Sequence, residues 1–267
     1  MNDAAAMKDK VVFITGGSDG YGKAAAKLFT ENGATVIIAA RTEHKLRSAQ
    51  AETGCKDYLV MDVMDPVGWE NARSFIIEKY KRIDVLINNA GGAVAVKSIS
   101  NTTVEEINKI IGLNLTGTIY GAHAFADIMK SQNRGTIINV SSVCAKHSWP
   151  GWSVYTAAKA GVIAFSKNLY VDLQHYNIRV TCIVPGAGST DFMLHAGGQN
   201  IKTKLKAEDV AEAMLAVCSL PQHAVVEELT IWGSDQIVIP LRQKTINNVD
   251  KCNNKSYSNC RKCNDIC

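Results

Sequence analysis

Long apolar runs are missing from this 267-residue sequence, which argues against a membrane-spanning protein. Its longest uncharged apolar stretches resemble VTCIVPGAG from Val180, whereas a membrane helix needs about 20 apolar residues. The first ten residues, MNDAAAMKDK, also lack the apolar core of a secretory signal. The sequence therefore predicts no membrane span, and we expect a cytoplasmic protein.

An excess of one charge is also missing from most of the chain. The net charge is +4, and residues 242–267 hold six basic and two acidic residues, a surplus of four. The remaining residues are therefore neutral overall and give no indication of a nucleic-acid-binding surface. At 46% apolar residues, the composition is typical of a folded globular protein.

Short apolar runs alternate with longer amphipathic stretches through residues 8–241. The runs begin at Val11, Thr35, Tyr58, Asp84, Gly135, Ile178 and Glu227. Continuous β-branched runs are typical of strands buried on both faces, and residues 22–33 have a helical pattern that ends at a glycine. The alternation predicts an α/β fold: a single-domain Rossmann fold with a doubly wound parallel sheet of about seven strands and about six helices.

Residues 242–267 have a different composition, rich in Asn, Lys and Ser and poor in large apolar side chains. We expect a disordered tail here. The tail also contains Cys252, Cys260, Cys263 and Cys267. Four thiols this close together leave a zinc or iron–sulfur site open as an alternative, although we predict no metal.

The glycine-rich stretch TGGSDGYG, from Thr15 to Gly22, follows the first strand and begins the first helix. That context predicts a pyrophosphate site, because a helix N-terminus offers free N–H groups and partial positive charge. Asp19 is an unexpected acid in such a site. It either caps the helix or faces a phosphate, and a purely structural turn also remains open.

The second strand ends in AARTEHKL, with Ala40 where an enzyme that prefers NAD has an acid for the ribose hydroxyl. Arg41 follows, and Lys45 comes four residues later. If a helix starts here, the two cations share a face and suit the 2′-phosphate of NADP(H). The alternative is an ordinary solvated start of a helix.

YTAAK places Tyr155 and Lys159 four residues apart in an apolar helical stretch, so that both side chains lie on one face. An ammonium beside a phenol lowers the pKa of the phenol, which suits proton transfer. Ser142 closes the fifth strand, where its hydroxyl can meet a substrate carbonyl. Asn114 is a polar residue in an apolar helix and needs a partner.

Taken together, these motifs resemble the short-chain dehydrogenase/reductase family over residues 8–241. The resemblance implies that Tyr155 is the general acid and that Ser142 orients the carbonyl. It also implies that Lys159 lowers the pKa of Tyr155 and holds the nicotinamide ribose, while Asn114 holds a water that relays protons to Lys159. The NADP(H) residues that it implies are Gly16, Ser18, Asp19, Gly20, Tyr21, Gly22, Arg41, Lys45, Asp62, Val63, Asn88, Ala90, Gly91, Tyr155, Lys159, Pro185, Gly186 and Thr190.

Two departures from the family pattern stand in the glycine-rich stretch. Tyr21 occupies a position that is often Ile, and we expect its backbone N–H to bind as usual. Asp19 stands where many relatives that use NADP have Ser or Arg.

The substrate loops hold Trp149, Trp152 and Phe192 with little charge, which indicates a fairly apolar carbonyl or alcohol substrate. The chain also resembles 3-ketodihydrosphingosine reductases and 3-oxoacyl-carrier-protein reductases, and the family implies a homodimer or homotetramer. Two other functions remain open: a non-catalytic NADP-binding sensor or scaffold, and a metal- or nucleic-acid-binding module acting through the tail.

Overall fold

The computed structural model describes residues 7–190, 192 and 202–236, which belong to a compact unit spanning Met1–Gln236. The tail that was predicted to be disordered lies outside the described residues. The strands are β1 Val11–Thr15, β2 Thr35–Ala40, β3 Asp57–Val60, β4 Val85–Asn88, β5 Gly135–Val140, β6 Ile178–Pro185 and β7 Glu228–Ile231. The helices of three turns or more are α1 Gly20–Glu31, α2 Glu43–Thr53, α3 Pro66–Tyr80, α5 Gly117–Gln132, α6 Ser153–Leu173 and α8 Ala207–Ser219.

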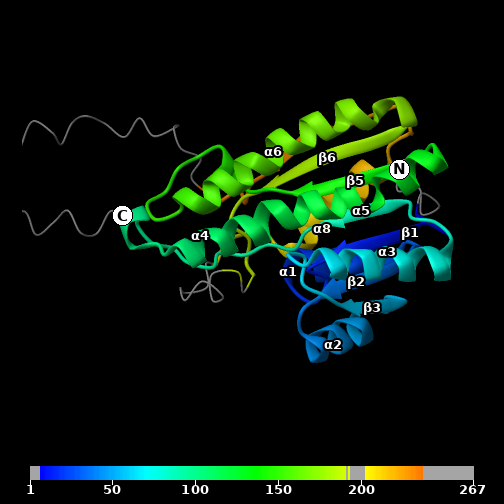
Figure 1. Ribbon diagram of the computed structural model, residues 1–267, viewed down its shortest axis with the longest axis horizontal. Coiled ribbons are helices and arrows are strands. Elements are labelled where there is room, and N and C mark those ends of the chain that lie inside the picture. The colour runs from blue at the N-terminus through cyan, green and yellow to red at the C-terminus, as the bar shows by residue number, and fades with distance from the viewer. Residues whose placement is uncertain (1–6, 191, 193–201, 237–267) are drawn as a thin grey trace, which may run out of the picture. The chain divides into compact units, whose positions relative to one another are not determined.

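Seven parallel strands form one sheet in the order β3-β2-β1-β4-β5-β6-β7, which confirms the predicted fold (Figure 1). The central strands are fully buried because helices cover both faces of the sheet. The edge strands β3 and β7 are only partly buried, so the expectation of burial on both faces is wrong for these two.

Alternation along each strand divides the core into two layers. Val12 and Ile14 of β1 pack with α1, α2 and α8 on one face, and Phe13 packs with α3, α5 and α6 on the other. Phe13, Trp69 and Phe125 meet edge to face, with ring centroids 5.7–6.5 Å apart. In Figure 1, α3 and α5 pass in front of the sheet while α1 and α8 lie behind it.

Short helical segments connect the longer elements. They are η1 Ile99–Asn101, α4 Val104–Ile111, the π-turn η2 Gly112–Thr116, η3 Val143–Ala145 and η4 Gln174–Tyr176. In α1, the last helical residue is Glu31 and Gly33 adopts a left-handed φ of 85° two residues later. This ending agrees with the glycine stop expected from the sequence.

Candidate active site

All parallel strands end at the same edge of the sheet, which brings the predicted motifs together there. The strand order reverses between β1 and β4, so that the connections after these two strands lead to opposite faces. In open α/β sheets, ligands bind at such a switch point. The glycine-rich stretch follows β1, Ala90 and Gly91 follow β4, and Ser142 follows β5.

The glycine-rich turn is held against the end of β4 by two residues that the sequence reasoning missed. The Asn89 amide donates to the carbonyls of Thr15 and Gly16, at 3.0 and 3.3 Å. The Thr15 hydroxyl accepts from the backbone N–H groups of Asn89 and Ala90, both at 3.1 Å. A Cβ on Gly22 would lie 2.3 Å from the Gly16 carbonyl oxygen, so the close approach of α1 requires glycine.

Asp19 is the N-cap residue of α1. It has extended backbone, with φ of −156°, and its carboxylate accepts from the Gly20 N–H at 2.7 Å. The structure therefore favours the capping alternative for this acid. Ser18 and Tyr21 flank this cap and are partly buried.

The second βα junction differs from the expected arrangement. The helix α2 begins at Glu43 with Thr42 as its N-cap, so Arg41 lies outside the helix and does not share a helical face with Lys45. Both cations are exposed, and among the described residues neither forms a salt bridge. The neighbouring Arg47 instead pairs with Glu43 at 2.6 Å. Arg41 and Lys45 thus present two cations at the end of β2.

Asp62 and Val63 lie in the turn after β3, because this strand ends at Val60 rather than continuing as the sequence run suggested. The Asp62 carboxylate accepts from the Met64 N–H at 2.9 Å, and the Val63 carbonyl accepts from the Trp69 indole at 2.8 Å. The turn is therefore fixed at the same sheet edge as the glycine-rich stretch.

Asn88 has a structural position within the sheet. Its side chain is 2% exposed and donates to Asn139 of β5 at 2.9 Å, while Asn139 donates to Ser166 of α6 at 2.9 Å. Its carboxamide oxygen is the one buried side-chain polar atom of the described residues without a hydrogen-bond partner. This side chain joins β4 to β5 and packs against α5, where a Cβ on Gly121 would lie 2.2 Å from its oxygen.

Lys159 is a buried ammonium beside the Tyr155 ring. Its side chain is 3% exposed, and Nζ donates to the Val140 carbonyl at 2.9 Å and lies 5.8 Å from the Tyr155 ring centroid. Burial lowers the pKa of Lys159 to about 8. Among the described residues, Val140 is its one hydrogen-bond acceptor, although an ammonium has three N–H groups to satisfy.

The pKa of Tyr155 is raised, whereas a lowered pKa was expected for this general acid. Burial raises the pKa of this phenol above its ordinary value of 10, and a hydrogen bond with Ser142 opposes the rise. The net pKa is therefore raised in the protein without cofactor, and the lowering expected from Lys159 stays a prediction. The phenol is thus protonated at neutral pH. The Ser142 hydroxyl also accepts from the Cys144 N–H at 3.2 Å.

Asn114 lies at the centre of the π-turn η2 and is fully buried. Its amide donates to the carbonyls of Gly92 and Ile110 at 2.9 and 3.0 Å, and its oxygen accepts from the Gly92 N–H at 3.0 Å. A Cβ on Gly91 would lie 2.9 Å from this oxygen and 3.1 Å from Nζ of Lys159. Asn114 and Lys159 therefore both border the space where a side chain at position 91 would stand.

Two aromatic rings pack against the Tyr155 ring. Trp152 and Phe192 are stacked, with ring centroids 6.3 Å apart and planes 11° apart. Both meet Tyr155 edge to face, at 5.3 and 5.9 Å. The other expected substrate-loop aromatic, Trp149, packs on His147, which also contacts Trp232. The cation nearest in sequence, Lys146, pairs with Glu228.

The segment after β6 returns toward the glycine-rich turn. The Gly186 N–H donates to the Ile231 carbonyl at 2.7 Å, and the Tyr21 hydroxyl donates to the Gly186 carbonyl at 3.3 Å. The Thr190 side chain lies 3.7 Å from where a Cβ on Gly20 would stand. Pro185, Gly186 and Thr190 are therefore gathered with the first βα turn.

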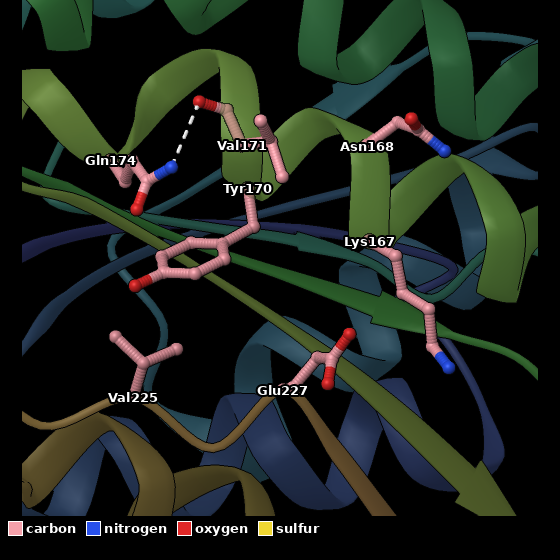
Figure 2. A pocket seen from close by; sticks show the side chains of 7 residues that line it. All are labelled: Lys167, Asn168, Tyr170, Val171, Gln174, Val225 and Glu227. Atoms are coloured by element: carbon pink, nitrogen blue, oxygen red, sulfur yellow. Dashed lines mark hydrogen bonds between the residues drawn. The ribbon is translucent and has the colours of Figure 1, made fainter.

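A hollow lies away from these residues, beside the C-terminal half of α6 (Figure 2). Its lining residues are Lys167, Asn168, Tyr170, Val171, Gln174, Val225 and Glu227, none of which is a predicted site residue. Among the described residues, no helix is long and apolar enough to cross a membrane, and no three potential metal ligands cluster. The tail cysteines lie outside the described part of the chain.

The family model described as short chain dehydrogenase matches residues 10–200. The chain belongs to this family. The resemblance drawn from the sequence is thereby confirmed, although the relatives found here bear other names than the two reductase branches compared above.

Curated relatives of this dehydrogenase cover most of its length. It is 35% identical to an NADP-dependent 3-hydroxy acid dehydrogenase YdfG of Salmonella typhi over 85% of this chain and 96% of the relative. It is 33% identical to a sulfoacetaldehyde reductase of Chromohalobacter salexigens over 84% of this chain and 94% of the relative. A solved serine dehydrogenase complexed with NADP⁺ superposes with a TM-score of 0.81 at 31% identity, covering 87% and 98% of the two chains.

Proposed function

We propose that this short-chain dehydrogenase transfers hydride between NADPH and a ketone or secondary alcohol, with Tyr155 as general acid or base. The observation that carries the proposal is the buried pair of Tyr155 and Lys159, beside Ser142 at the end of β5. A buried ammonium with one protein acceptor is costly to keep unless a ligand completes its partners. The relatives named as NADP-dependent support the choice of cofactor.

The residues present fit NADP(H). The N-terminus of α1 suits the pyrophosphate, and Arg41 with Lys45 suits the 2′-phosphate. A side chain at position 91 would cover Nζ of Lys159, so glycine there keeps Nζ uncovered on this side. When bound, the nicotinamide supplies the hydride that reduces the carbonyl carbon.

The side chains supply the proton and the orientation. Ser142 donates a hydrogen bond to the carbonyl oxygen and polarises it, and the protonated Tyr155 phenol gives its proton to that oxygen as the alcohol forms. Lys159 stabilises the resulting phenolate, because its charge is largely retained below its pKa of about 8. Asn114 binds the water through which Lys159 regains protons, using the remaining lone pair of its oxygen.

The substrate carries a fairly apolar group beside its carbonyl. The stacked rings of Trp152 and Phe192 beside Tyr155 support this part of the proposal. The names of the relatives support a second candidate, a small aldehyde or hydroxy acid that carries an anionic group. We further propose a cytoplasmic homodimer or homotetramer whose catalytic domain spans residues 8–241.

A panel of carbonyl substrates followed by NADPH absorbance tests these proposals. The panel pairs aromatic and alicyclic ketones with sulfoacetaldehyde and 3-oxo acids, and the expected preference is for the first group. Tyr155→Phe is expected to lower kcat by at least about 100-fold while NADPH binding remains. If no substrate is turned over although NADPH binds, the sensor or scaffold function replaces the enzyme.

A further inference from the structure

The side chain of Tyr21 links two segments that are far apart in the sequence. It projects from the first turn of α1 and donates to the Gly186 carbonyl at 3.3 Å, 165 positions along the chain. Burial raises the pKa of Tyr21 to about 12. The hydroxyl is therefore protonated throughout the physiological range and remains a hydrogen-bond donor.

Gly188 is matched to this phenol. A Cβ built on Gly188 would lie 2.2 Å from the Tyr21 hydroxyl oxygen and 2.9 Å from two of its ring carbons. No side chain fits at position 188 while the Tyr21 ring keeps this place. An aliphatic residue at position 21 would fill part of this space and would not form the hydrogen bond to the Gly186 carbonyl.

The linked segment leads from the end of β6 to the reacting groups. Two residues after Gly188 lies Thr190, beside the glycine-rich turn, and Phe192 reaches the Tyr155 ring at 5.9 Å. Tyr21 thus stands between the pyrophosphate end of the proposed cofactor site and its catalytic end.

We propose that Tyr21 is a positioning residue. Its hydroxyl holds the backbone segment from Gly186 through Gly188 in place for the nicotinamide half of NADP(H). This inference rests on the proposed function and adds to it a side-chain role, where only backbone binding was expected. The adenosine half lies across the switch point, beside Arg41 and Asp62, and does not depend on this link. Loss of the Tyr21 hydroxyl should therefore weaken binding of the nicotinamide half and leave binding of the adenosine half unchanged.

Tyr21→Phe tests the inference through two ligands measured by calorimetry. The Kd of NADPH is expected to rise about 3- to 10-fold, which corresponds to the loss of one hydrogen bond. The Kd of adenosine 2′,5′-bisphosphate, which lacks the nicotinamide half, is expected to stay within about 2-fold. Tyr80→Phe is the matched control, because it removes a phenol hydrogen bond to Asp57 far from the site and should change neither Kd.

Three outcomes would overturn the inference: both ligands weakened alike, neither weakened, or NADPH bound more tightly because the phenol had blocked it. Failure of the proposed function has a different signature, since wild-type protein would then not bind NADPH or would turn over no substrate.

A second set of variants tests the match between the two positions. Gly188→Ala is expected to weaken NADPH binding in the wild type, where the new methyl group meets the hydroxyl. Tyr21→Ala clears that space. In this background, adding Gly188→Ala should raise the Kd of NADPH by less than half the fold-change that it causes in the wild type. Equal costs in the two backgrounds would contradict the matched pair, and thermal unfolding of each variant verifies that it folds.

Discussion

At the scale of single residues, the buried Lys159 side chain has the clearest physical consequence. Its ammonium lies in the protein interior with Val140 as its acceptor, so that burial disfavours the charged form. The same residue is chemically useful only while charged, because a neutral amine would not stabilise the Tyr155 phenolate. The protein therefore retains a destabilising charge where the reaction needs it.

Lys159 should make stability depend on pH in the absence of cofactor. Its folded-state pKa of about 8 is below the ordinary 10.5, so the unfolded chain binds more protons between these values. Below pH 8 the folded protein carries the whole free-energy cost of the buried Lys159 charge. As pH rises above this value, Lys159 loses its proton in the folded state and the cost decreases. Relative to Lys159→Met, the free energy of unfolding should increase by about 2 kcal/mol from pH 7.5 to 9.5, at about 1.4 kcal/mol per pKa unit.

Urea unfolding of both proteins at each pH measures this difference. The pKa values of Cys144 and Cys182 are raised by burial, and that of Tyr155 is raised too, but their contributions are largely shared by both proteins and cancel. A constant difference across this range would contradict the assigned titration.

Arg41 should determine the choice between the two nicotinamide cofactors. Arg41→Asp is expected to lower the ratio of NADPH to NADH kcat/KM by at least about 10-fold, because a charged hydrogen bond to phosphate contributes roughly 1.5–3 kcal/mol. Arg47→Ala is the control, since Arg47 is also exposed but pairs with Glu43 on α2. An unchanged ratio in Arg41→Asp would assign the 2′-phosphate to other groups.

At the scale of elements, the start of α1 combines a helix cap with the N–H groups that we propose bind the pyrophosphate. Asp19 occupies one N–H at the helix N-terminus, that of Gly20, which leaves the following groups for a pyrophosphate. The π-turn η2 has a comparable function, because it sets Asn114 within reach of Gly92. In both cases the end or interruption of a helix supplies the polar groups.

Asp19 should behave as a helix cap. Asp19→Ala is expected to lower the free energy of unfolding by about 1 kcal/mol, while Asp19→Ser should retain most of it, because serine also caps. Neither change should alter the NADPH-to-NADH ratio. Asp65→Ala, which removes the cap of α3, is the matched control for stability alone. An increased NADPH preference in Asp19→Ser would show instead that the carboxylate faces the 2′-phosphate.

At the scale of the whole molecule, α6 serves the site at one end and presents an exposed surface at the other. Tyr155 and Lys159 lie in its first two turns, whereas Tyr170 and Val171 line the separate hollow near its C-terminus (Figure 2). Val171 is 57% exposed and borders this hollow.

The proposed oligomer should depend on this end of α6. Val171→Asp is expected to reduce the mass measured by light scattering to that of a smaller assembly, because a carboxylate cannot be buried in an apolar interface. Val67→Asp on α3 is the control, since Val67 is equally exposed at 57%. If both variants keep the wild-type mass, the subunits associate elsewhere or not at all.

The sequence by itself determined the fold and the motifs that form the site, because both depend on local patterns. Continuous apolar runs located all seven strands, and glycine spacing located the turn after β1. The four-residue spacing of Tyr155 and Lys159 predicted that they share one helix, which is α6. These inferences succeeded because strands and helices have fixed periods and turns require particular residues.

The tertiary structure decided whatever depends on contacts between distant segments. It raised the pKa of Tyr155, since burial depends on what surrounds the phenol and not on its neighbours in sequence. It placed Asn89 on the glycine-rich turn and Tyr21 on Gly186, over separations of 73 and 165 positions. No periodicity encodes such contacts, because they exist only after the parallel strands bring their carboxyl ends to one edge of the sheet.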